Sequence, residues 1–169
     1  MNILDIARKR FSVRSYSNRE IPQETLDIIL EAAHVAPSAA NLQPVRILVI
    51  KSDEAKKKLS KAANIYNAPI ALLVCSDTSK SWTRPFDGMK STDIDASIIT
   101  DHMMLSATEQ GLGSVWICYF KPDVIKNEFD LPENLEPINI LAIGYTDERS
   151  DITRHAGERI PKEELITYL

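Results

Sequence analysis

The sequence predicts one layered α/β (α+β) domain, in which helices flank a central mixed β-sheet of about four to five strands. Two observations predict this fold. Four apolar, β-branched segments alternate with helical patterns along the 169-residue chain. These segments are almost continuously apolar, which is typical of strands covered on both faces. We expect a single domain over residues 1–169, because the chain has no internal repeat, low-complexity stretch or linker.

The composition is that of an ordinary globular protein and argues against several functional classes. Hydrophobic residues make up 44% of the chain, charged residues 26%, and the net charge is -4, which argues against nucleic-acid binding. Apolar runs such as Pro69–Cys75 are too short to span a bilayer, and Met1–Ile6 lacks the apolar region of a signal peptide. We therefore expect a cytoplasmic protein without a membrane or nucleic-acid partner.

The cysteines and histidines indicate neither a disulfide nor a metal site. Cys75 and Cys118 lie in apolar, strand-like contexts and are expected to be free thiols. His34, His102 and His155 are scattered, and no CxxC motif occurs. We expect no metal.

Capping and proline signals set the elements in the first part of the chain. Asn2–Lys9 is expected to be a helix with Asn2 as its cap. An extended segment, Arg10–Arg14, follows. The next helix opens at Ile21-Pro22 and must end near Ala36, because Pro37 disfavours the α conformation in the residue before it.

The rest of the chain alternates between strands and helices. Strands are expected at Val45–Ile50, Ile70–Cys75, Ser114–Phe120 and Ile138–Tyr145. Helices are expected at 53–63 with Asp53 as the cap, at Asp93–Gln110, from Lys121-Pro122-Asp123 and from Pro161. The segment Ser76–Met89 is expected to be irregular. The Asp93–Gln110 helix is broadly apolar, so we expect it to be central or at an interface.

The segment Arg10-Phe11-Ser12-Val13-Arg14 is a candidate anion site. In an extended backbone Arg10, Ser12 and Arg14 share one face, and Phe11 and Val13 share the other. Two guanidinium groups and a hydroxyl suit a phosphate. The same spacing also fits a solvated basic turn whose apolar residues are simply buried.

The Pro37–Pro44 loop is small, polar and low in charge. It could let another surface approach closely, or it could be an ordinary connection between a helix and a strand. The chain has no GxGxxG after a strand, because Gly111-x-Gly113 falls at the end of a helix. It also has no GxSxG or other pairing of a nucleophile with a base.

Four segments in order resemble the flavin-dependent nitroreductase family, and the match covers essentially the whole chain. They are Arg10–Tyr16, Ala36–Pro44, Asp93–Ile117, and Ile140–Tyr145 with Arg159. The family implies FMN, held non-covalently at the interface of a homodimer.

The resemblance also assigns the cofactor-binding residues. Arg10, Ser12 and Arg14 match positions that hold the FMN phosphate and ribityl chain, and Arg159 matches a late basic position that joins them. The remaining matches are Pro37, Ser38 and Asn41 in a loop that approaches the flavin, often from the partner subunit, and Ile117, Cys118 and Tyr119 beside the isoalloxazine ring.

The implied activity is that of an FMN-dependent NAD(P)H oxidoreductase that reduces nitroaromatics, quinones or another acceptor in a ping-pong cycle. The flavin would carry the chemistry, so no catalytic side chain is expected. Lys61 or Asn64 lies in the region that would stabilise a reduced flavin. A non-catalytic protein that stores or senses FMN is the alternative, and a dehalogenating or flavin-fragmenting enzyme is a third.

The chain departs from the family at three places. Cys118-Tyr119 stands where members often have glycine, which bears on the approach of the backbone to the ring. Phe11 stands where many members have a polar or basic residue. The helical excursions that cover the active site in larger members are missing or reduced to Ser76–Ser91, which predicts an open pocket or one formed mostly by the partner.

Overall fold

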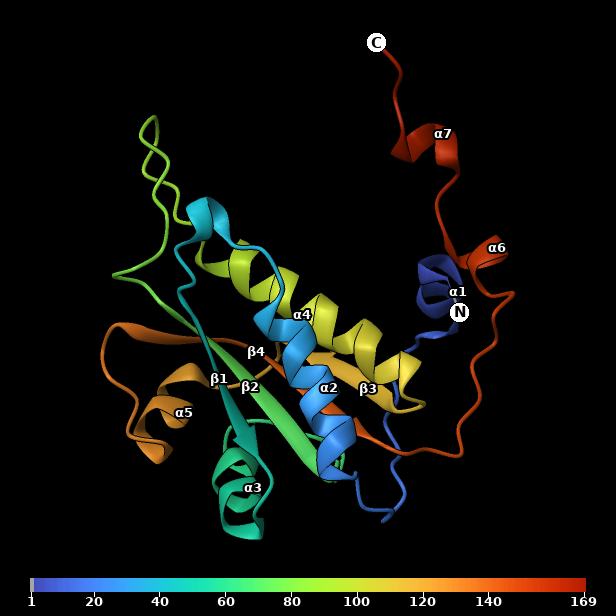
Figure 1. Cartoon of the computed structure of the whole chain (residues 1–169), viewed down its shortest axis with the longest axis horizontal. Coiled ribbons are helices and arrows are strands. Elements are labelled where there is room, and N and C mark those ends of the chain that lie inside the picture. Colours follow the sequence, from blue (N-terminus) through green and yellow to red (C-terminus); the bar gives the residue numbers. More distant parts are fainter. Residues whose placement is uncertain (1) are drawn as a thin grey trace.

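Four antiparallel strands form one sheet in the computed structural model, which describes residues 2–169 (Figure 1). The strands are β1 (Val45–Ile50), β2 (Ile70–Asp77), β3 (Gly113–Ile117) and β4 (Leu135–Gly144), and they lie in the order β1-β2-β4-β3. Every neighbouring pair is antiparallel. The sheet is thus antiparallel rather than mixed as predicted, and an isolated parallel bridge joins Ser12 to Ser114 at the outer edge of β3, outside the named strands.

Helices cover both faces of this sheet. They are α1 (Ile3–Lys9), α2 (Gln23–His34), α3 (Asp53–Ser60), α4 (Thr92–Glu109), α5 (Pro122–Glu128), α6 (His155–Glu158) and α7 (Lys162–Leu165), with a 3₁₀ turn, η1, at Ala39–Asn41. The helices α2 and α4 pack on one face, and α3 and α5 pack on the other (Figure 1). The predicted layered α/β fold is confirmed.

The alternation of side chains along β2 creates two separate cores. Leu72 and Val74 point to the α2–α4 layer, whereas Leu73 and Cys75 point to the α3–α5 layer. All of these side chains are fully buried. Both faces of the central strands are therefore shielded from solvent, which explains why their sequences are continuously apolar.

Three predicted boundaries are corrected by the structure. Asp53 is not the cap of α3, because the side chain of Ser52 accepts a hydrogen bond from the Ala55 N–H at 3.2 Å. The α3 helix ends at Ser60 rather than near residue 63. The strand expected at Ser114–Phe120 ends at Ile117, after which Cys118 and Tyr119 are exposed.

Two further segments are more regular than the sequence indicates. The strand expected to end at Cys75 continues to Asp77, and residues 78–91 then form a projecting hairpin closed by a bridge between Thr83 and Lys90. The short helix α6, at His155–Glu158, was not predicted. The predicted helix from Pro161 is present as α7.

The long helix α4 crosses the sheet and defines the two ends of the molecule (Figure 1). Its N-terminal end lies beside η1 and the 78–91 hairpin, and its C-terminal end lies near α1. Met103 and Ala107 are fully buried, while Ile94 is exposed. The helix is thus central, as expected, and part of its surface remains open.

Gly113 allows the segment that contains Arg10, Ser12 and Arg14 to lie against β3. A Cβ at this position would meet Val13 Cγ2 at 2.6 Å and Thr146 Cγ2 at 2.9 Å. Val13 itself is fully buried, and its N–H donates to the Ser114 carbonyl at 2.9 Å.

We predict that Gly113→Ala lowers the free energy of unfolding by about 1–3 kcal/mol, because the added methyl overpacks this contact. Gly157→Ala is the matched control, since nothing lies within 4 Å of a Cβ there. Its effect should stay within about 0.5 kcal/mol, as for ordinary surface substitutions. Urea unfolding of both variants checks this, and equal midpoints would contradict it.

Candidate functional site

Three guanidinium groups gather where α1 ends. Arg10 caps the C-terminus of α1 and is half-buried. Burial lowers the pKa of Arg10, the positive charges of Arg154 and Arg159 lower it further, and the negative charge of Asp101 partly opposes them. The structure therefore brings Arg10 and Arg159, which the family resemblance assigns to one site, into one electropositive region, and adds Arg154.

Arg154 was missed as a site residue, although it precedes Arg159 by only five residues in the same polar tail. Its guanidinium donates hydrogen bonds to the backbone carbonyls of Arg8, at 3.1 Å, and of Arg10. These bonds fasten the 150s segment to the end of α1. Because they use carbonyl acceptors, the full positive charge of Arg154 remains beside Arg10.

The extended segment shows the predicted alternation only from Ser12 to Arg14, because Arg10 and Phe11 are both partly exposed. Val13 is fully buried, whereas Ser12 and Arg14 are exposed. The Arg14 guanidinium lies 5.8 Å from the centre of the Tyr66 ring. Arg14 therefore points toward the loop that follows α3, whereas Ser12 is exposed two residues after Arg10.

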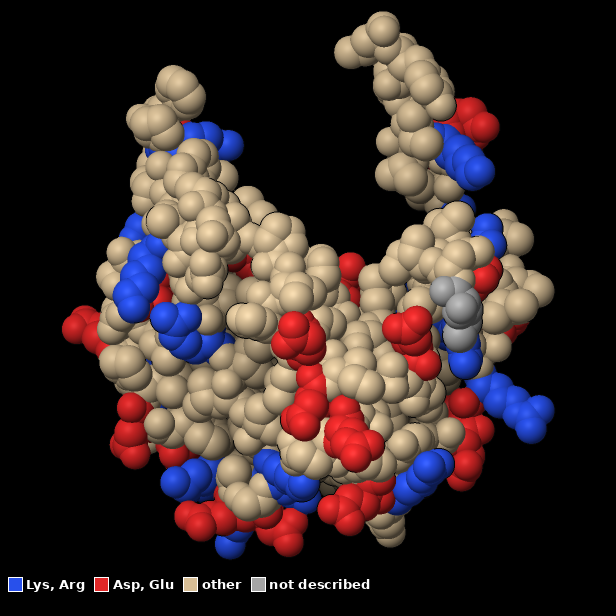
Figure 2. Space-filling view, viewed as in Figure 1, with Lys and Arg blue, Asp and Glu red and all other residues tan. Residues whose placement is uncertain are grey.

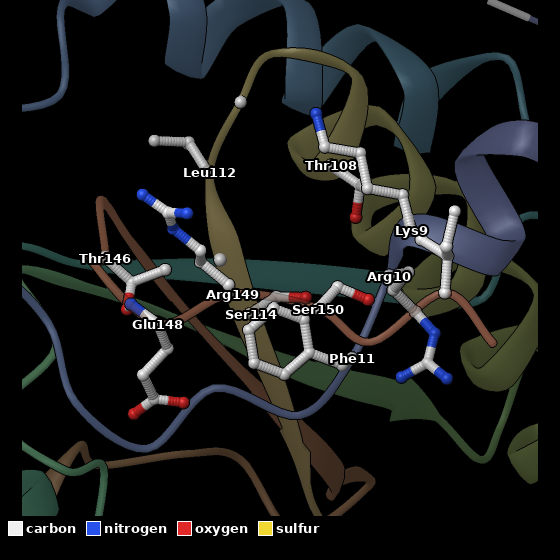
Figure 3. Close-up of a pocket in the computed structure, with 13 residues that line it drawn as sticks. Lys9, Arg10, Phe11, Thr108, Leu112, Ser114, Thr146, Glu148, Arg149 and Ser150 are labelled. Carbon is white, nitrogen blue, oxygen red and sulfur yellow. The ribbon is translucent and has the colours of Figure 1, made fainter. Parts of the chain in front are cut away.

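A cavity of about 410 Å³ lies on the Phe11 side of this segment (Figure 3). Its walls come from α1, the end of α4, the start of β3 and residues 146–152. Lys9, Arg10 and Arg149 contribute positive charge and Glu148 contributes negative charge. The hydroxyl of Ser114, also in the wall, is buried and has no hydrogen-bond partner. Ser12, Arg14 and Arg159 do not line this cavity, so it adjoins the predicted anion face rather than coinciding with it.

A second, smaller hollow of about 260 Å³ lies beyond the end of β3. Its lining includes Lys61, Asn64, Tyr66, Ile117 and Tyr119. Lys61 Nζ is 2.6 Å from a carboxylate oxygen of Glu128, and Asn64 Oδ1 accepts from the Tyr66 N–H at 2.8 Å. The structure thus groups both candidates for the ring end with Ile117 and Tyr119, and places Arg14 beside them.

Cys118 and Tyr119 turn outward immediately after β3. Tyr119 is 97% exposed and Cys118 is also exposed, so neither side chain packs across the end of the strand. Cys75 is buried, and burial raises its pKa to about 12. Both cysteines are free, as predicted.

The Pro37–Pro44 loop lies at the opposite end of α4 from the arginines. The Ala39 N–H donates to the Asp95 carboxylate at 2.9 Å, near the start of α4. Thr108, near the end of α4, lines the cavity beside Arg10. The rise of an α-helix separates Asp95 from Thr108 by about 20 Å. One chain therefore does not bring Pro37, Ser38 and Asn41 to the arginine cluster.

Two absences hold for residues 2–169. No group of His, Cys, Asp and Glu side chains there is arranged to hold a metal ion. No helix in that range is long and apolar enough to cross a membrane.

The chain belongs to the nitroreductase family. The model of that family matches residues 7–65 and 57–145, and so spans the arginine segment, the loop and all four strands. A crystal structure of a nitroreductase family protein from Clostridium difficile is 54% identical, with a TM-score of 0.96, over 99% of this chain and 98% of that one.

Two other relatives carry more specific names. A Bacillus subtilis protein named FMN reductase [NAD(P)H] is 32% identical over 94% of this chain and 74% of its own length. The solved structure of an FMN-dependent nitroreductase from Clostridium difficile is 31% identical, with a TM-score of 0.72, over 86% of this chain and 88% of that one.

Proposed function

We propose that this chain is an FMN-dependent NAD(P)H oxidoreductase that works as a homodimer in the cytoplasm. The observation that carries the proposal is the cluster of Arg10, Arg154 and Arg159 beside the exposed Ser12, at the edge of the sheet. The names of the two relatives, FMN reductase and FMN-dependent nitroreductase, support the cofactor and the activity.

The residues present fit FMN. A doubly charged phosphate would relieve the mutual repulsion of Arg10 and Arg159, and Ser12 would donate a hydrogen bond to it. The flavin ring would extend along β3 toward Ile117, Cys118 and Tyr119. Arg14 at that end would place positive charge where a reduced flavin carries negative charge.

FMN, when bound, supplies the hydride chemistry. The side chains bind and orient it, and none acts as an acid or base. The outward-facing Cys118 and Tyr119 leave the end of β3 open, so NAD(P)H and the acceptor would occupy the same place in turn. We infer ping-pong kinetics, with nitroaromatics and quinones as acceptors, because an open site admits flat aromatic molecules of different sizes.

The surface of α1, α2 and α4 supports the dimer. A groove of about 630 Å³ there has an apolar part, which includes Ile3, Ile28, Val35 and Leu105, and a polar part formed by Glu31, Asp101, His102, Ser106 and Glu109. Val35 is 67% exposed and Ile3 is 61% exposed. Exposed apolar side chains grouped in this way mark interaction surfaces.

The C-terminal arm, residues 160–169, supports the same conclusion. It projects from the body, and Figure 2 shows a hollow between it and the 78–91 hairpin. Ile160, Leu165 and Tyr168 are exposed on it. A two-fold dimer would cover the groove and the arm. With the two α4 helices antiparallel, it would also bring the loop of one copy to the arginines of the other.

Steady-state kinetics test the proposed activity. The FMN-loaded protein should oxidise NADH or NADPH with menadione and with a nitroaromatic as acceptors. Parallel double-reciprocal lines are expected for a ping-pong order. A yellow protein without turnover on any acceptor would favour the alternative, a protein that stores or senses FMN.

We predict that Arg10→Ala and Arg14→Ala each weaken FMN binding by about 1.5–3 kcal/mol, the contribution of a hydrogen bond to a charged group. Equilibrium dialysis or fluorescence titration measures this. Arg8→Ala is the matched control, because Arg8 is an exposed arginine on α1. Its ion pair with Asp5 is long, at 4.0 Å, so its loss should have little effect. Full flavin occupancy in the Arg10→Ala variant would disprove the phosphate assignment, and full occupancy in the Arg14→Ala variant would disprove the contact at the ring end.

We predict that Val35→Glu yields a monomer that has lost most of its FMN, because a buried charge opposes association and the partner's loop completes the site. Light scattering and the flavin absorbance of the same sample measure both effects. Val49→Glu on β1 is the control, since Val49 is exposed but lies outside the groove. A monomer with full flavin occupancy would refute the shared site.

A further inference from the structure

A buried carboxylate lies beneath the Pro37–Pro44 loop. Asp95, in the first turn of α4, is 1% exposed. One of its oxygens accepts from the Ala39 N–H at 2.9 Å, and the other accepts from the Ser91 hydroxyl at 2.7 Å. Within residues 2–169 no Lys, Arg or His forms an ion pair with it. Burying a carboxylate is costly unless its oxygens are hydrogen-bonded, so both donors are needed to hold it.

The turn above Asp95 has an unfavourable backbone conformation. Ala40 has φ 50°, Asn41 has φ 55° and Gln43 has φ 51°, although none of them is glycine. The left-handed region is sparsely populated by residues with a Cβ, and such strain persists only where the surroundings enforce it. Inside the loop, the Ser38 carbonyl and hydroxyl accept from the N–H groups of Asn41 and Gln43, each at 3.0 Å.

Asp95 fixes this turn from outside. In the described part of the chain, it supplies the side-chain hydrogen bond that reaches residues 38–41 from beyond the loop. The bond anchors Ala39, directly before the first left-handed residue. Pro37 and Asn41 remain exposed and Ser38 is partly exposed, so the anchored turn presents them outward.

We propose that Asp95 is a positioning residue, which holds the Ala39–Asn41 turn in its left-handed conformation so that Ser38 and Asn41 meet the flavin of the partner subunit. This inference rests on the proposed function, in which the loop completes the FMN site of a second copy. Asp95 does not touch the flavin and acts through the backbone of the turn.

Substitutions at position 95 separate the hydrogen bond from the charge. Asp95→Asn keeps an oxygen for the Ala39 N–H and gains an amide that can donate to the Ser91 hydroxyl. Asp95→Ala removes both bonds. Ala40→Gly lowers the cost of the left-handed conformation, because glycine adopts it readily.

The test is a titration of FMN against the full-length dimer of each variant and of the Asp95→Ala/Ala40→Gly double variant. Asp95→Ala should raise the Kd about tenfold, as for the loss of one charge-assisted hydrogen bond. Asp95→Asn should stay within about twofold of wild type if the remaining oxygen preserves the bond. Ala40→Gly should return the Asp95→Ala variant to within about threefold of wild type, because it lowers the conformational cost of the first left-handed residue of the turn.

Recovery of FMN affinity by Ala40→Gly distinguishes a positioning role from a general loss of stability. If Asp95 only stabilised the fold, a change in the backbone preference of residue 40 would not restore the affinity. Ile50→Ala, a core truncation at the far end of β1, controls for lost stability, and its melting temperature should fall without a change in FMN affinity. An unchanged Kd in Asp95→Ala would overturn the proposal. A raised Kd that Ala40→Gly does not restore would also overturn it.

Hydrogen exchange of the flavin-free protein separates this proposal from the proposed function. Peptides that cover residues 38–42 should exchange faster in Asp95→Ala than in wild type or Asp95→Asn, whether or not the wild type turns over NAD(P)H. Equal exchange in all three would overturn the anchoring role alone. Failure of the wild type to bind FMN would overturn both proposals.

Discussion

The contact between Val13 and Gly113 is the constraint on which the candidate site depends. Because Gly113 has no side chain, Val13 packs within van der Waals reach of the β3 backbone, and the next residue, Ser114, accepts the Val13 N–H. This pairing fixes the register of the whole 10–14 segment. Arg10 and Arg14 lie on either side of Val13 in the sequence. If the register of this segment against β3 shifted by one residue, their side chains would point to the opposite face. The positions of the two cations therefore follow from one backbone pairing at the sheet edge.

The α4 helix imposes a second constraint, which is distance. Its N-terminal turn carries the Asp95–Ala39 bond, and its C-terminal turn borders the Arg10 cavity. A straight helix cannot bring its own ends together. The two groups of residues that the family resemblance assigns to one cofactor are thus separated within a single chain. We propose that the Pro37–Pro44 loop of one copy meets the Arg10 cluster of the other in a dimer. The length of α4 and the groove beside it support this arrangement.

Much of the fold could be predicted because its signals are local. Apolar runs mark the strands, and the residue before Pro37 marks the end of α2. The alternation at Arg10–Arg14 likewise predicts that Val13 is buried between the exposed Ser12 and Arg14, although Phe11 is only partly buried. The predicted start of a helix was less accurate where two neighbouring residues could each act as the N-cap. Ser52 and Asp53 are both good capping residues, and only the position of the Ala55 N–H decides between them.

The parts of the site that could not be predicted depend on contacts between distant residues. Arg154 binds the carbonyls of Arg8 and Arg10, which lie more than a hundred residues earlier in the sequence. The left-handed turn at Ala40 could not be predicted, because it contains no glycine. The group that holds it is the carboxylate of Asp95, which lies on α4. The assignments of Ile117, Cys118 and Tyr119 to the flavin ring remain predictions.

The C-terminal arm has a consequence for how the protein behaves on dilution. Its apolar side chains, such as Leu165 and Tyr168, are exposed in the single chain, and the proposed dimer would cover them. Association of this kind obeys mass action, and a ligand held between two copies shares that dependence. In the proposed dimer, cofactor occupancy becomes a function of protein concentration as well as FMN concentration. The arm would then couple the amount of the protein in the cell to the fraction that is active.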